Sequence, residues 1–176
     1  MLKNEAKWIG DVTKNLKVDS VLDISGGDWF FRNIRQSFIE KYIFKNLKNV
    51  RRTNIKDDVC SKRFRKIGKF DLVFANNLLE HVKNIKNATK NISSAVNPGG
   101  YLCVSTPFDF PYHPDPIDNG FRPTPEELIK FFPGTKVIKK DIITQEIKIM
   151  FTKREIMFNK KYSASCLLLK FSLAKR

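Results

Sequence analysis

A glycine pair that follows a short apolar segment is the first place where this chain could hold a ligand. Residues 20–24 read Ser-Val-Leu-Asp-Ile and run directly into Ser25, Gly26 and Gly27. Glycine lets a backbone approach a ligand closely, and a helix that starts after such a turn offers free N–H groups. The G-x-G-x-x-G spacing of a dinucleotide fingerprint is absent. The turn therefore predicts a ligand contact at Gly26 and Gly27, without indicating a nicotinamide dinucleotide.

Proton transfer and metal binding depend on few residues in this chain, which has two histidines and three cysteines. His81 lies in a Leu-Glu-His-Val turn, where we expect a structural role with its ring hydrogen-bonded. His113 lies in a proline-rich loop and is the better candidate for a base or an acceptor contact, with fastening of the loop as the alternative. Two histidines without clustered ligands make a poor metal site, so we expect none. The scattered cysteines predict neither disulfides nor a zinc knuckle, which favours a cytoplasmic location.

The elements that must position these residues alternate between strands and helices. Apolar residues spaced three to four apart predict helices over 2–16, 30–43 and 85–96, and Pro98-Gly99-Gly100 is expected to end the last of them. Short apolar runs predict strands over 20–24, 50–55, 70–75 and 101–105. Thr124-Pro125-Glu126-Glu127 has the pattern of a helix start, and two late strands over 137–143 and 164–173 flank a basic connection. One α/β domain over residues 1–176 is expected, with a mostly parallel sheet covered by helices on both faces and a late antiparallel edge hairpin.

The positive charge of the chain is uneven. The formal net charge is +15, but residues 71–135 carry five Lys or Arg and seven Asp or Glu, a net charge of −2. The basic flanks are compatible with a nucleic-acid partner, and equally with a compositional bias toward lysine in an AT-rich genome. No apolar run approaches the roughly 20 residues of a membrane span, and the first residues lack the apolar core of a secretory signal.

Four segments in order carry a family resemblance. They are Val-Leu-Asp-Ile-Ser-Gly-Gly at 21–27, the strand at 70–75 with its Asn-Asn-Leu-Leu-Glu-His-Val tail, the Pro-Gly-Gly strand at 97–105, and the proline-rich loop at 107–128. Together they resemble the class I S-adenosylmethionine-dependent methyltransferases, most closely the small type 11 members, over about residues 18–132. The resemblance implies a Rossmann-like fold, S-adenosylmethionine as the cofactor, and in-line transfer of its methyl group to an acceptor.

The resemblance also implies which residues contact the cofactor. The acid inside the first strand would orient the cofactor's amino group, directly or through water, and the turn after it would face the cofactor. One of two acids after the second strand would accept the ribose hydroxyls, and an Asn after the central strand would line the methionine part or the adenine. Ordinary roles as a buried carboxylate, a strand-to-helix turn or a solvated loop are the alternatives. The set is Asp23, Ser25, Gly26, Gly27, Asp57, Asp58, Asn76 and Asn77.

The chain departs from the family pattern at the adenosine side. Ser25 stands at the position of the family's first glycine, Trp29 replaces its third, and only residues 59–69 remain for a third strand, which is therefore expected to be reduced. Three functions stay open. A methyltransferase for a small-molecule or sugar-type acceptor is favoured by the near-neutral loop at 107–123. A nucleic-acid methyltransferase is favoured by the basic flanks, including 62–66. The departures favour a non-catalytic binding protein with this fold.

Overall fold

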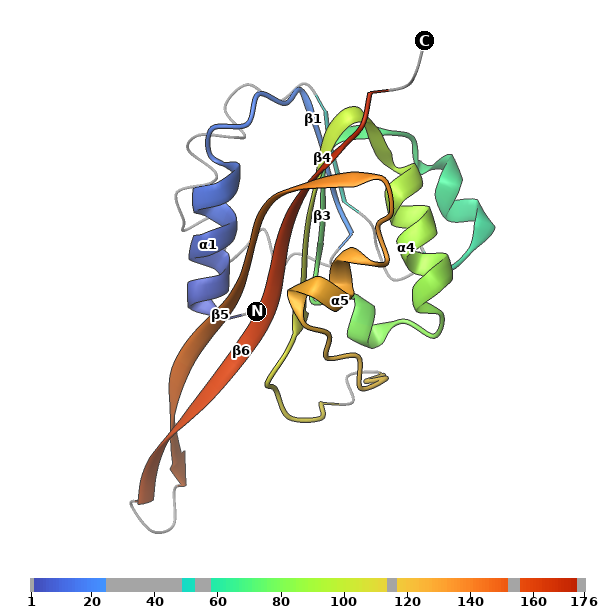
Figure 1. The fold of residues 1–176 in the computed structure, drawn as a ribbon. Coiled ribbons are helices and arrows are strands. Elements are labelled where there is room, and N and C mark those ends of the chain that lie inside the picture. Colours follow the sequence, from blue (N-terminus) through green and yellow to red (C-terminus); the bar gives the residue numbers. More distant parts are fainter. Residues whose placement is uncertain (1, 25–48, 53–57, 114–116, 152–155, 174–176) are drawn as a thin grey trace.

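The structure is a computed structural model, and it describes residues 2–24, 49–52, 58–113, 117–151 and 156–173 (Figure 1). The helix predicted over 30–43 lies outside these residues, as do Ser25, Gly26, Gly27, Trp29 and Asp57. No described helix has the length and apolar character needed to cross a membrane.

Six strands form one sheet in the order β2-β1-β3-β4-β6-β5. The first four in this order pair in parallel, and β6 and β5 pair antiparallel at the edge. Among the described residues no strand lies beyond β2, so the mostly parallel sheet, the late edge hairpin and the reduced third-strand region are confirmed. The strands are β1 Ser20–Asp23, β2 Asn49–Arg52, β3 Phe70–Asn76, β4 Val96–Pro107, β5 Thr135–Phe151 and β6 Ile156–Phe171.

Helices cover both faces of the sheet, as expected (Figure 1). The helix α1 lies on one face, and α4 and α5 lie on the other. Successive strand residues point to opposite faces, so Val73 packs in the apolar layer under α4 while its neighbours Leu72 and Phe74 pack under α1. The helices are α1 Lys3–Thr13, α4 Ile85–Ser94 and α5 Pro125–Ile129, with 3₁₀ turns η2 Lys62–Ile67 and η3 Leu79–His81.

The prediction that Pro98-Gly99-Gly100 ends a helix is wrong. The helix α4 already ends at Ser94, and β4 begins at Val96 rather than at Tyr101. The register of β4 against β3 shifts in this region, because the prolyl-glycyl segment forms a bulge inside the strand. A Cβ atom at Gly100 would lie 2.9 Å from the carbonyl oxygens of Asn97 and Asp71, so the bulge needs a residue without a side chain.

The late hairpin is much longer than expected. The paired strands β5 and β6 run from Thr135 opposite Phe171 to Phe151 opposite Ile156, and the basic connection assigned to 144–163 lies mostly within them. Figure 1 shows the far end of this hairpin extending beyond the rest of the fold. Five of the eight residues over 142–149 are β-branched, which suits a strand, although the surrounding lysines suggested a loop.

Candidate functional site

Buried polar residues gather where β1, β3 and β4 end. These strands are parallel, so their carboxyl ends meet at one edge of the sheet, and Asn76 pairs in register with Ser105. The side chains of Asp23, Asn76, Ser105 and Thr106 are all buried there. Ligands of open α/β sheets bind outside this edge, so polar groups concentrated in it form a candidate binding site.

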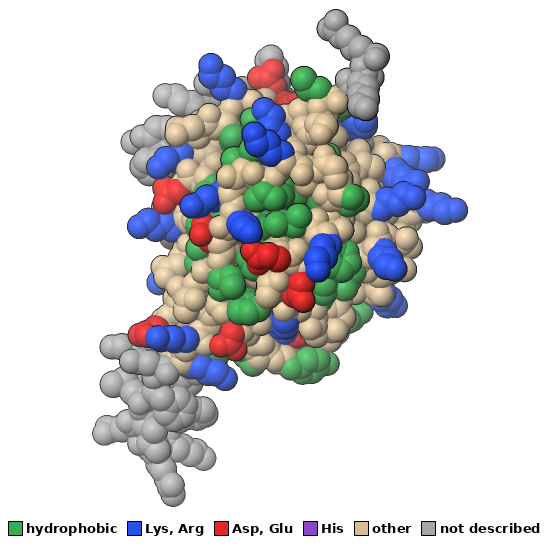
Figure 2. Space-filling view, in the orientation of Figure 1, with side chains coloured by type: hydrophobic (Ala, Val, Ile, Leu, Met, Phe, Trp, Pro, Cys, Tyr) green, Lys and Arg blue, Asp and Glu red, His purple; other side chains and the backbone are tan. Residues whose placement is uncertain are grey.

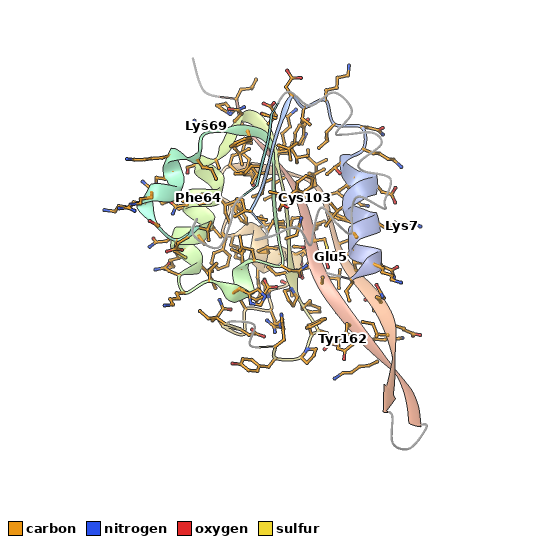
Figure 3. The ribbon with its side chains drawn as sticks, turned by 180° about the vertical axis from the view of Figure 1, so that it is seen from behind. Glu5, Lys7, Phe64, Lys69, Cys103 and Tyr162 are labelled. Carbon is orange, nitrogen blue, oxygen red and sulfur yellow. The ribbon has the colours of Figure 1, made fainter. Side chains whose placement is uncertain are left out.

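Glu5 joins this edge from the N-terminal helix. Its side chain is 1% exposed, and its Oε1 accepts hydrogen bonds from Asn77 Nδ2 at 2.9 Å and Ser105 Oγ at 2.5 Å. Its Oε2 accepts one from the Leu2 backbone N–H at 3.0 Å. Figure 3 shows Glu5 on the side of α1 that faces the strands, with Lys7 on the opposite side. The carboxylate therefore ties α1 to the ends of β3 and β4.

The two asparagines after β3 differ in position. Asn76 is buried, with its Oδ1 3.1 Å from Ser105 Oγ. Asn77 has a φ of 47°, in the left-handed region that asparagine tolerates better than most residues, and its N–H donates to the Ser105 carbonyl at 2.9 Å. This conformation ends the strand and turns the chain into η3. Of the two, Asn76 is the residue enclosed in the polar edge.

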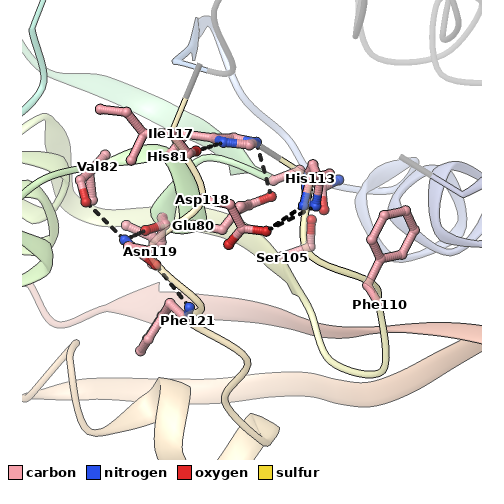
Figure 4. Close-up of polar contacts among 12 residues, drawn as sticks. Glu80, His81, Val82, Ser105, Phe110, His113, Ile117, Asp118, Asn119 and Phe121 are labelled. Carbon is pink, nitrogen blue, oxygen red and sulfur yellow. Dashed lines mark hydrogen bonds and ion pairs between the residues drawn. The ribbon is translucent and has the colours of Figure 1, made fainter. Parts of the chain in front are cut away.

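A second polar cluster follows directly, in η3 (Figure 4). Glu80 is 0% exposed, and neither of its carboxylate oxygens has a hydrogen-bond partner among the described residues. Burial raises the pKa of Glu80 to about 8. His81 Nε2 lies 3.7 Å from Glu80 Oε1, and the ring centroids of His81 and His113 lie 5.1 Å apart at nearly a right angle. The chain thus brings both of its histidines to one buried carboxyl group.

The proline-rich loop is held around Asp118. This carboxylate accepts hydrogen bonds from Arg122 Nη2 at 2.6 Å and from the backbone N–H groups of His113 and Gly120 at 2.9 Å each. The Arg122 hydrogen bonds hold the pKa of Asp118 well below its usual range, against the opposing effect of burial. The Asp118–Arg122 ion pair therefore fixes the backbone that carries His113.

Asn119 fastens the same loop to the turn that carries Glu80. Its side-chain amide donates to the carbonyls of Leu79 and Val82 at 2.8 Å each, and its backbone N–H donates to the Glu80 carbonyl at 2.8 Å. Figure 4 shows these contacts between the loop and η3. The positions of Glu80 and His113 relative to each other therefore follow from a connected set of hydrogen bonds.

The structure brings only some of the predicted site residues together. Asp23, Asn76 and Asn77 lie at the polar edge, whereas Asp58 is exposed in a turn, where its Oδ1 accepts from the Cys60 N–H at 2.8 Å. His113 lies beside His81 and Asp118. Sequence reasoning missed Glu5, whose only signal was its place in the first helical turn, and it gave no role to Glu80.

A separate cavity of about 880 Å³ lies between α4 and α5. Lys86, Lys90, Phe121 and Lys130 help to line it, and no predicted site residue does. Figure 2 shows Lys and Arg side chains, in blue, along the side of the molecule where α4 lies. The cavity is therefore distinct from the polar edge, although Arg122 borders it from the loop.

Comparisons with known proteins agree with this geometry. The family described as methyltransferase domain matches residues 6–138. Similar solved structures include TehB from Haemophilus influenzae (TM-score 0.60, 12% identity, 94% of this chain and 62% of that one). They also include N-methyltransferase NodS from Bradyrhizobium japonicum WM9 in complex with S-adenosyl-l-homocysteine (TM-score 0.54, 10% identity, 95% of this chain and 85% of that one). A third is an O-methyltransferase family protein from Burkholderia thailandensis (TM-score 0.56, 14% identity, 97% of this chain and 57% of that one).

The solved structures share little sequence with this chain, so their likeness shows the fold, and the chain spans about three fifths of the length of TehB. No curated protein matches the chain. The family match is independent of the fold comparison and covers most of the residues between α1 and the start of β5. Solved structures named as methyltransferases share its fold, and the family match shows that the chain belongs to the methyltransferase domain family.

Proposed function

We propose that this chain is a methyltransferase that binds S-adenosylmethionine at the polar edge of β1, β3 and β4. The transferred methyl group would go to a small-molecule or sugar-type acceptor. The observation that carries the proposal is the burial of Asp23 and Asn76 at the carboxyl ends of two parallel strands, in a member of a methyltransferase family.

The described residues fit the methionine part of this cofactor. That part carries a cationic amino group and a sulfonium, and the polar edge offers the Asp23 carboxylate and the Asn76 amide. Carboxylate oxygens are the acceptors that an ammonium group prefers. For the ribose, Asp58 is the described candidate, and its exposed turn would have to close over the cofactor.

The cofactor, when bound, supplies an electrophilic methyl group. The task of the chain is then to hold an acceptor atom in line with that group and to exclude water. Asp23 and Asn76 would orient the amino-acid end, and the Glu5–Ser105 hydrogen bond would keep the ends of β3 and β4 fixed. The loop at 107–123, which Asp118 and Arg122 hold in shape, would cover the acceptor.

The charge distribution supports a small acceptor over a nucleic acid. The loop beside the polar edge carries Asp109 and Asp118 and one Arg among its described residues, whereas most described lysines lie on α1, η2, α4 and the β5–β6 hairpin. A polyanion would be bound mainly through lysine and arginine contacts to phosphate. Such a substrate would therefore contact the elements that carry the lysines, and the net negative charge of the loop beside the site would not favour it.

Isothermal titration calorimetry with S-adenosylmethionine and S-adenosylhomocysteine tests the proposal. We expect both to bind the wild-type chain, and Asp23→Asn to weaken binding at least tenfold. Asp11→Asn, which alters an exposed acid paired with Lys14 on α1, is the matched control and should bind normally. A folded wild-type chain that gives no heat with either compound would refute the proposal that the chain is a methyltransferase. RNA binding that falls steeply with salt would redirect the acceptor proposal to nucleic acid.

A further inference from the structure

We propose that Glu80, His81 and His113 bind one divalent transition-metal ion, with Zn²⁺ as the best match. The three residues each offer a ligand atom, and these atoms all lie within 4.8 Å of one another. The inference does not depend on cofactor binding, because none of the three belongs to the polar edge proposed to hold the methionine part. It replaces the expectations that the chain has no metal site and that His113 acts as a base.

Glu80 is the first reason to expect a ligand. Buried side-chain oxygens almost always have hydrogen-bond partners, because leaving them without one costs free energy. Both Glu80 carboxylate oxygens lack such a partner among the described residues, and its side chain is fully buried. The His81 Nε2 atom, 3.7 Å away, is beyond hydrogen-bonding distance. A cation between these two atoms would satisfy the carboxylate.

The hydrogen bonds of the two imidazoles are the second reason. His81 Nδ1 bonds to the Ile117 carbonyl, and since a carbonyl can only accept, Nδ1 carries the hydrogen and Nε2 the lone pair. His113 Nδ1 lies 3.1 Å from the Pro111 carbonyl and 3.2 Å from Asp118 Oδ2. Both of these groups are acceptors, so Nδ1 of His113 also carries the hydrogen and its Nε2 the lone pair. Metal-binding histidines typically have their other ring nitrogen held by a carbonyl or a carboxylate in this way.

The spacing suits a small ion. Ligand atoms at about 2.0–2.2 Å from a tetrahedral Zn²⁺ lie roughly 3.4 Å apart. The Glu80 and His81 atoms at 3.7 Å are already close to this spacing. The ligand atoms of all three residues lie within 4.8 Å of one another, so His113 needs to approach the other two only slightly when an ion binds. The ring contact with His81 shows that the two imidazoles are already neighbours.

The ligand types identify the class of metal. Two imidazoles and one carboxylate suit borderline ions such as Zn²⁺, Co²⁺ and Mn²⁺, and they leave a coordination position for water or another ligand. Mg²⁺ and Ca²⁺ prefer sites made of oxygen atoms. Both histidines of the chain belong to this cluster, so a metal bound through imidazole must bind here.

Metal titration of the chelator-treated full-length chain tests the inference. We expect one Zn²⁺ or Co²⁺ per chain at micromolar ion concentration by calorimetry, and Co²⁺ bound with the visible absorption of nitrogen and oxygen ligands. Glu80→Gln, His81→Gln and His113→Gln should each weaken binding tenfold or more. Cys60→Ser is the matched control, because it removes the partly exposed thiol that could bind zinc adventitiously.

Two results would overturn the site. One is a folded wild-type chain that binds neither Zn²⁺ nor Co²⁺. The other is binding that Cys60→Ser abolishes and both histidine variants leave unchanged. Circular dichroism establishes whether each variant is folded. If Glu80→Gln does not fold, the two histidine variants still test the site, because both rings are only half-buried and their replacement should leave the fold intact. The cofactor titration of wild type is a separate measurement, so either proposal can fail without the other.

Discussion

Replacement of Glu5 by alanine is expected to destabilise the fold strongly although the residue lies at the third position of a terminal helix. The substitution removes an acceptor of three hydrogen bonds, from the Leu2 N–H, Asn77 Nδ2 and Ser105 Oγ. A hydrogen bond to a charged group contributes about 1.5–3 kcal/mol, and such contributions add incompletely. Ser105 is fully buried, and its hydroxyl would keep only the longer contact to Asn76 Oδ1 at 3.1 Å. We therefore expect a loss of about 3–5 kcal/mol.

Thermal unfolding followed by circular dichroism measures this loss. For a chain of this length 1 kcal/mol corresponds to about 2–4 °C in Tm, so Glu5→Ala should lower Tm by roughly 6–20 °C. Glu5→Gln keeps the shape and one acceptor oxygen, and should lose about 1–2 kcal/mol. Asp11→Ala on the same helix removes an acid whose side chain is 51% exposed and paired with Lys14. This control should cost less than about 1 kcal/mol.

The comparison with Asp11→Ala decides the outcome. If Glu5→Ala unfolds within a degree or two of that control, the hydrogen bonds of Glu5 contribute no more than an exposed ion pair. The interpretation of Glu5 as the link between α1 and the ends of β3 and β4 would then be wrong.

Two further predictions concern the opposite end of the sheet. Asp71 accepts hydrogen bonds from the Asp19 N–H, the Ser20 N–H and hydroxyl, and the Asn97 amide; partial burial acts to raise its pKa, but these bonds together lower it. Because the folded pKa lies below the unfolded one, this stability is present above about pH 4 and is lost as the pH falls through the folded pKa. Urea unfolding between pH 5 and 2 should therefore show a loss in wild type that Asp71→Asn lacks, and parallel pH profiles would contradict the assignment. Gly100→Ala should cost about 1–3 kcal/mol in the same assay, because its Cβ would meet two backbone oxygens at 2.9 Å; a change below about 0.5 kcal/mol would show that the bulge can relax.

The parts of the fold that follow from periodicity could be predicted from the sequence. The apolar run at 70–75 predicted β3, and the Thr-Pro-Glu-Glu sequence predicted the start of α5 with its capping box, because both signals are local. The length of the hairpin could not be predicted in this way. Lysines on β5 look like loop residues, yet an edge strand exposes one side to water and tolerates them. The bulge at Gly100 depends on the carbonyl of Asp71 on a neighbouring strand, which no local pattern contains.

The positions of the candidate site residues could also be predicted only in part. Asp23, Asn76 and Asn77 could be predicted because they occupy strand ends, and parallel strands place their ends together. Glu5 could not, since its partners Asn77 and Ser105 follow it in the sequence by 72 and 100 residues. The meeting of His81 with His113 depends on the path of a proline-rich loop. That path is set by Asp118, which bonds within the loop, and by Asn119, whose bonds to the carbonyls of Leu79 and Val82 appear only in the folded chain.

The two buried glutamates near this edge show that burial alone does not assign a role. Glu5 accepts three hydrogen bonds, so its charge is compensated within the fold and its role is structural. Glu80 accepts none through its carboxylate among the described residues, although its backbone carbonyl is bonded to Asn119. A fold that needed only packing at this position would favour an apolar side chain, because a buried carboxyl group without partners is costly even when it is protonated. The placement of two imidazoles beside Glu80, each with Nδ1 already hydrogen-bonded, is best explained by a cation that all three residues share.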